Sequence, residues 1–66
     1  MQRYLAFLLW PEGGVVRQEE FSCADDAAAL ERAKAMATEQ HHVELWEVES
    51  PRRIARFEPA RMRTAN

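Results

Sequence analysis

The distribution of apolar and polar residues divides the chain into four predicted strands and one predicted helix. Residues 2–10 carry apolar side chains at odd and even positions alike from residue 4 onward, which is typical of a strand covered on both faces. In residues 43–49, Val43 and Leu45 alternate with Trp46 and Val48. Residues 15–21 and 53–58 form more polar strands. The first and third strands are therefore expected at the centre of a sheet.

Residues 23–40 are the only segment with helical periodicity. Ala, Leu, Glu, Lys, Arg and Met dominate it, without Gly or Pro, and these residues favour helix. Ser22 and Asp25 are both candidate N-caps. At 100° per residue one stripe collects the apolar positions, namely Ala29, Leu30, Ala33, Met36 and Ala37. A stripe made mostly of alanine packs closely on a sheet but cannot supply the whole core.

The connections complete a β-β-α-β-β order. Residues 11–14, Pro-Glu-Gly-Gly, predict a tight turn; a phosphate loop would end in Lys-Ser/Thr and open a helix. We expect an α+β fold, with one four-stranded, mostly antiparallel sheet and a single helix on one face. The strand order 2-1-3-4 keeps the apolar strands central, and 2-1-4-3, with the first and last strands parallel, is the alternative. Residues 1–59 form the predicted domain and 60–66 a flexible basic tail.

One helix can cover only one face of this sheet, so apolar side chains remain uncovered on the opposite face. If Leu5, Phe7 and Leu9 face the helix, the opposite face carries a surplus; the two sets could be exchanged, and a surplus remains. An exposed apolar patch of several hundred Å² usually marks an interface. We therefore predict a face-to-face homodimer. Its predicted contact residues are Tyr4, Leu8, Trp10, Trp46 and Val48.

Size and composition support this expectation. A chain of 66 residues has marginal stability unless a disulfide, a metal or an oligomer interface adds to it. Cys23 is the only cysteine, so no intrachain disulfide forms, and the chain suits a reducing compartment. It has no apolar run of the roughly 18 residues that span a bilayer and no convincing signal peptide. We expect a cytoplasmic protein that does not enter membranes.

The positive charge is concentrated near the end of the chain. The net charge is −2, yet residues 51–66 contain five arginines and one glutamate. The candidate basic patch consists of Arg52, Arg53, Arg56, Arg61 and Arg63. It could bind a nucleic-acid backbone. Alternatively, Arg53 and Arg56 could pair across a hairpin with Glu44, Glu47 or Glu49.

Candidate catalytic and metal-binding residues are few. His41 and His42, with Glu39 and Glu44, form the one cluster of possible metal ligands, but adjacent histidines do not easily reach one ion and no second ligand pair exists. We interpret both histidines as helix-terminal residues. Cys23 would need an oriented base to act as a nucleophile, and we interpret it as a small buried or half-buried thiol. We predict no catalytic residue, metal or cofactor.

The chain resembles a group of short bacterial proteins of unknown function. The matching segments are residues 25–28 (Asp-Asp-Ala-Ala), 41–46 (His-His-Val-Glu-Leu-Trp) and 52–55 (Arg-Arg-Ile-Ala). In that group the residue after the first histidine is often Asp, where this chain has His42. The resemblance implies the same ββαββ fold and brings no activity or cofactor with it.

The functional hypothesis is a non-enzymatic protein-protein interaction module, acting as a homodimer. The alternatives are an accessory nucleic-acid-binding protein that uses the C-terminal arginines, or a small inhibitor of a larger bacterial complex.

Overall fold

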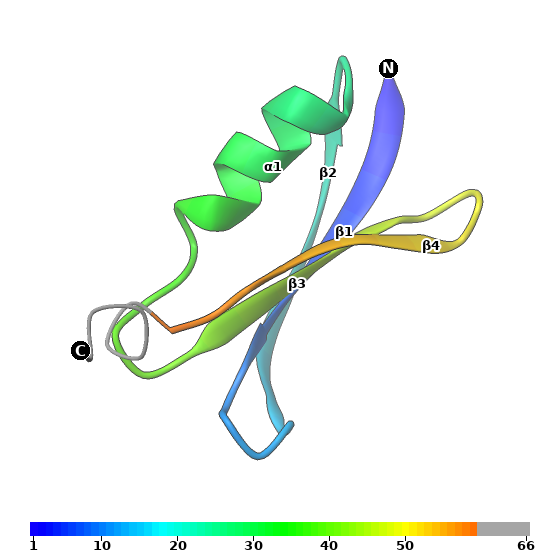
Figure 1. The fold of residues 1–66 in the computed structure, drawn as a ribbon. Coiled ribbons are helices and arrows are strands. Elements are labelled where there is room, and N and C mark those ends of the chain that lie inside the picture. Colours follow the sequence, from blue (N-terminus) through cyan, green and yellow to red (C-terminus); the bar gives the residue numbers. More distant parts are fainter. Residues whose placement is uncertain (60–66) are drawn as a thin grey trace.

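The computed structural model, which describes residues 1–59, has one antiparallel sheet and one helix (Figure 1). The strands occur in the order β2-β1-β3-β4. The element bounds are β1 Gln2–Leu9, β2 Val15–Cys23, α1 Asp26–Lys34, β3 His42–Glu47 and β4 Arg52–Phe57. The predicted α+β fold is confirmed, and the first of the two strand orders is the one found. The predicted tail, residues 60–66, lies outside the described residues.

The β1–β2 hairpin is closed by the turn that the Pro-Glu-Gly-Gly segment predicts. The Trp10 N–H donates to the Gly14 carbonyl at 2.8 Å, and the Gly13 N–H donates to the Trp10 carbonyl at 2.9 Å. Gly13 has φ +110°, a conformation that side-chain-bearing residues rarely adopt. The turn places the whole of β2 alongside β1, with a register shift between Leu8 and Leu9.

Helix α1 begins where the second N-cap candidate predicts and ends earlier than expected. Asp25 is the N-cap, and its carboxylate accepts the Ala28 N–H at 2.9 Å. The predicted range of residues 23–40 is too long at both ends, since Cys23 ends β2 and α1 stops at Lys34. At the second end, the N–H groups of Met36 and Ala37 donate to the carbonyls of Ala33 and Lys34, three residues back, and this tighter turn ends the helix. The Thr38 hydroxyl then accepts the backbone N–H groups of Gln40 and His41, and this local turn keeps the following residues out of the helix.

The core lies between α1 and one face of the sheet. Ala29 and Ala33 of the helix are fully buried, and Leu30 packs against the same core, so the predicted stripe is confirmed for these three residues. Met36 and Ala37 also pack against the core, but from the segment that follows the helix. The sheet contributes Tyr4, Ala6, Leu8, Phe21, Val43 and Leu45. Small alanines let the helix approach closely, and the large side chains come from the strands.

Tyr4 and Leu8 therefore belong to the core, and their predicted place on the outer face is wrong. The Tyr4 side chain is fully buried, and its ring stacks on Phe21 with centroids 5.9 Å apart. The orientation of β1 follows from the tyrosine hydroxyl, whose polar partner, Asp26, lies at the start of the helix. A buried hydroxyl needs such a partner. The other set of β1 side chains consequently points away from the helix.

Candidate interaction surface

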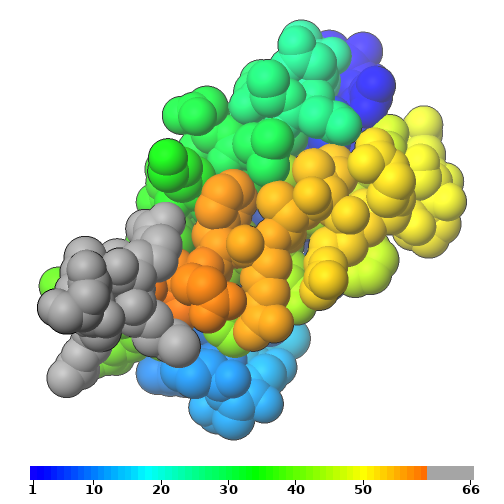
Figure 2. Space-filling view, in the orientation of Figure 1, coloured from blue at the N-terminus to red at the C-terminus, as the bar shows by residue number. Residues whose placement is uncertain are grey.

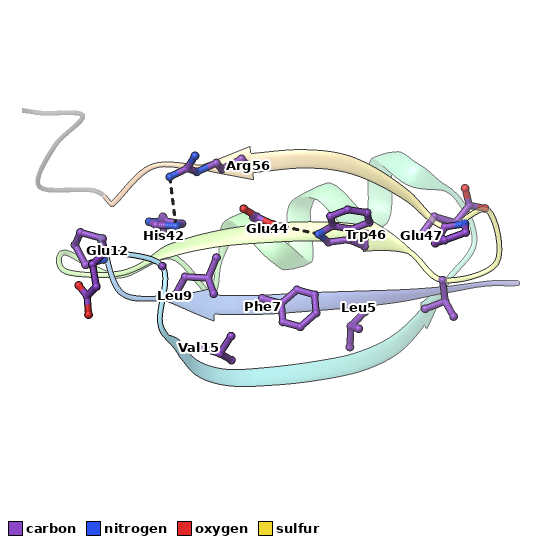
Figure 3. A pocket seen from close by; sticks show the side chains of 14 residues that line it. Leu5, Phe7, Leu9, Glu12, Val15, His42, Glu44, Trp46, Glu47 and Arg56 are labelled. Atoms are coloured by element: carbon purple, nitrogen blue, oxygen red, sulfur yellow. Dashed lines mark hydrogen bonds between the residues drawn. The ribbon is translucent and has the colours of Figure 1, made fainter.

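The face of the sheet opposite the helix carries an open groove of about 720 Å³, which we call the outer groove (Figure 3). Its apolar lining residues are Leu5, Phe7, Leu9, Pro11, Val15, Trp46, Val48 and Pro51. Its remaining lining residues are Glu12, Gly13, His42, Glu44, Glu47 and Arg56. Most of the lining comes from the central strands β1 and β3 and from the turns at their ends.

The strand register explains the centre of the outer groove. In the β1–β3 pairing Leu5 lies opposite Trp46, so both side chains project from the same face. Figure 3 shows Leu5, Phe7 and Trp46 close together on that face, with the helix behind the sheet. All three are half-buried, because neighbouring side chains cover part of each. The result is a partly covered aromatic and aliphatic surface with water on its open side.

The outer groove also contains polar side chains. The Trp46 indole N–H donates to a Glu44 carboxylate oxygen at 3.2 Å. His42 is almost fully buried, and its Nε2 lies 3.4 Å from an Arg56 guanidinium nitrogen. Because arginine only donates hydrogen bonds, His42 is the acceptor in this pair. Trp46 thus bonds to Glu44 and Arg56 to His42 within the monomer, and within residues 1–59 the apolar part of the groove stays open on the side away from the helix.

The structure places the predicted contact residues in three different positions. Trp46 and Val48 line the outer groove, whereas Tyr4 and Leu8 lie beneath the helix. Trp10 is 41% exposed at the end of β1, and its ring packs on the His41 ring with centroids 4.2 Å apart. Trp10 is therefore beside the groove lining rather than part of it.

Leu5, Phe7 and Leu9 line the outer groove but are absent from the predicted contact residues, although the sequence left open which of the two sets meets the helix. The alternation along the strand separates the two sets of side chains correctly but does not say which set meets the helix. The hydroxyl of Tyr4 was the available signal, because a tyrosine packed under a helix that begins with Asp25 and Asp26 has a polar partner in reach.

The arginines of the last strand are paired with carboxylates. Figure 2 shows β4, coloured yellow to orange, on the surface beside the helix. Arg52 lies 2.9 Å from Glu47 and 3.3 Å from Asp26. Arg53 lies 3.8 Å from Glu44, which confirms one of the predicted cross-strand pairs.

Arg56 pairs with a different glutamate from those predicted, because its guanidinium lies 3.6 Å from Glu58. Arg61 and Arg63 lie outside the described residues. The described arginines of the candidate basic patch thus form ion pairs and are not unpaired positive charges.

Tyr4, Asp26 and Arg52 form a polar chain that joins β1, α1 and β4. The Tyr4 hydroxyl donates to Asp26 at 2.7 Å, and Arg52 donates to the second carboxylate oxygen. Burial, followed by this hydrogen bond, raises the pKa of Tyr4 to about 12. The hydrogen bond from Tyr4, with the Arg52 guanidinium beside it, lowers the pKa of Asp26. This chain holds the helix start against the sheet, and the Arg52–Glu47 pair connects it to one residue of the groove lining.

The histidines do not end the helix, and that interpretation is wrong. His41 lies in the loop after α1, where its Nδ1 is 2.8 Å from the Thr38 hydroxyl, and His42 is the first residue of β3. Cys23 is a free, half-buried thiol at the end of β2. Within residues 1–59, no three His, Cys, Asp or Glu side chains are grouped in a way that could hold a metal ion.

Comparisons of the chain with protein-family models, with curated proteins and with solved structures find no match. The resemblance to short bacterial ββαββ proteins accordingly stays a prediction. Within residues 1–59, no helix is long and apolar enough to cross a membrane.

Proposed function

We propose that this protein is a non-enzymatic interaction module that self-associates through the outer groove. The observation that supports the proposal is the unpartnered apolar surface formed by Leu5, Phe7 and Trp46, on the face of the sheet that the helix leaves open. The proposal places the module in the cytoplasm, where its free cysteine stays reduced.

Energetics favour an occupied groove. Fully burying one large apolar side chain contributes roughly 1.5 to 3 kcal/mol, and the total stability of a domain this small lies near the lower end of the about 5 to 15 kcal/mol range. Covering several half-buried side chains at once therefore adds a large fraction of the stability of the monomer. A partner that covers the groove supplies what the single helix cannot.

The nucleic-acid alternative has less support. Arg52, Arg53 and Arg56 each lie within 4 Å of a carboxylate, so phosphate binding would have to displace those pairs. The groove itself is lined by Glu12, Glu44 and Glu47, which repel a polyanion. Interaction with another protein surface is the function that the described residues support best.

Replacing Trp46 with glutamate tests the proposal. The Trp46→Glu variant should raise the dissociation constant of the self-association about 10- to 100-fold, because it removes one buried aromatic and introduces a charge without a partner. Sedimentation velocity over a concentration series measures the change. Val16→Glu is the matched control, since Val16 is exposed on β2 and lies outside the groove lining. Equal sedimentation of both variants and the unsubstituted protein would count against the proposal.

A further inference from the structure

The outer face carries a row of four side chains whose character reverses from one edge of the sheet to the other. The strand registers place Glu20 of β2 opposite Leu5, Leu5 opposite Trp46, and Trp46 opposite Arg53 of β4. Across the sheet the row therefore reads acidic, apolar, apolar, basic. Such a row is complementary to its own reverse, because the acid then meets the base and the two apolar residues meet each other.

The next row along the strands has a different pattern. Gln18 lies opposite Phe7, Phe7 opposite Glu44, and Glu44 opposite Arg56. This row lies near the middle of the outer groove, between the Leu5–Trp46 pair and the Leu9–His42 pair. If a second copy faces this row in reversed order, Gln18 of one copy lies beside Arg56 of the other, and Glu44 lies beside Phe7. If the second copy faces it in the same order, Glu44 lies on Glu44 and Arg56 on Arg56.

These two placements correspond to the two aligned ways of stacking the sheets of two copies about a two-fold axis. An axis parallel to the central strands reverses each row, so that β2 of one copy faces β4 of the other. An axis across the strands keeps the order of each row and sets like strands on like strands. The second arrangement opposes like charges at the centre of a desolvated contact, which is strongly unfavourable.

We infer that the partner in the outer groove is a second copy of this chain, related by a two-fold axis parallel to β1 and β3. The inference rests on the proposed function and specifies its geometry. Trp46 of each copy packs on Leu5 of the partner subunit, and Arg53 of each copy lies near Glu20 of the partner subunit. Each outer groove is completed by side chains of the other copy.

The dimensions of the molecule agree with such a pair. Its Cα atoms extend over 37 × 21 × 15 Å, so its broad face is of the size needed to bury the about 800 Å² per partner of a standard interface. At the β2 edge of the outer face, Arg3 and Glu20 of one copy form an ion pair at 2.6 Å. Arg53 of the partner subunit would join this pair and extend it into a small network.

Crosslinking of single-cysteine variants tests the axis. Cys23→Ser/Gln18→Cys and Cys23→Ser/Arg56→Cys are mixed, allowed to exchange subunits and treated with a short bismaleimide. This reagent is chosen because facing sheets lie about 10 Å apart, which exceeds the reach of a disulfide. Mass spectrometry distinguishes the mixed product from the two self-products. The native mass of each variant is measured before crosslinking.

The inferred axis predicts that the mixed Gln18→Cys with Arg56→Cys product dominates and that each variant alone gives almost no crosslinked dimer. Self-crosslinking of the Arg56→Cys variant, without the mixed product, would establish the axis across the strands and overturn the inference. A protein of dimer mass that gives no crosslink at either position would overturn it too, since its contact lies elsewhere. A monomeric mass for the unsubstituted chain would instead overturn the proposed function itself.

Discussion

Tyr4 is the residue that decides which face of the sheet meets the helix. Its ring fills the core against Phe21, and its hydroxyl reaches Asp26 at the start of α1. Turning β1 over would bury Leu5 and Phe7 beneath the helix, but it would leave Asp26 without this hydrogen-bond donor. This hydrogen bond therefore favours the observed orientation of β1.

The alkaline titration of Tyr4 should report this environment directly. Tyr4 is the only tyrosine in the chain, so tyrosinate absorbance near 295 nm measures it alone. We expect a pKa of about 12 in the folded protein, against 10.0 for an ordinary tyrosine. Because the folded pKa is the higher one, the stabilising contribution is fully present below pH 10 and is lost as the pH rises toward 12.

The control for this titration is the same protein in concentrated urea, where Tyr4 should titrate at its ordinary value. Substituting Asp26 with Asn removes the anionic acceptor and should lower the folded pKa of Tyr4 while burial still holds it above 10.0. Identical titration curves in the folded and unfolded states would show that the hydroxyl is in water.

At the scale of elements, the sequence predicted more than it did for single side chains. The order of strands and helix, the turn at residues 11–14 and the alanine stripe all follow from local patterns that no distant contact overrides. The helix end was missed because the composition of residues 35–40 favours helix, whereas the backbone tightens to three-residue hydrogen bonds at Met36 and Ala37 and the Thr38 hydroxyl then accepts the next available N–H groups. The orientation of β1 was left open because both of its faces are apolar, and only a contact distant in sequence separates them.

The two glycines of the β1–β2 turn should differ in their tolerance of a side chain. Gly13→Ala should destabilise the fold by about 1 to 3 kcal/mol, because φ +110° is strained for any residue with a Cβ. Gly14→Ala is the matched control. Its added Cβ would lie 3.6 Å from the Trp10 ring, an ordinary contact, and the change should stay within about 1 kcal/mol. Urea unfolding measures both, and equal losses would contradict the assigned turn geometry.

At the scale of the whole molecule, residues 1–59 contain one helix for a sheet with two apolar faces. The sequence alone predicted this mismatch and the homodimer that would resolve it, because the count of apolar positions exceeds what an alanine stripe can cover. It did not assign these residues to one face correctly, since Trp46 and Val48 lie on the outer face while Tyr4 and Leu8 lie in the core. The arrangement of charges around the groove depends on strand register, which no local pattern contains.

The most direct test is the native mass of the tag-free protein, measured by light scattering over a wide dilution series. If a second copy covers the outer groove, the mass is twice the 7.7 kDa of the chain and persists on dilution until it falls cooperatively to the monomer value. A mass of 7.7 kDa at every concentration would contradict the central claim, because Leu5, Phe7 and Trp46 would then remain in contact with water.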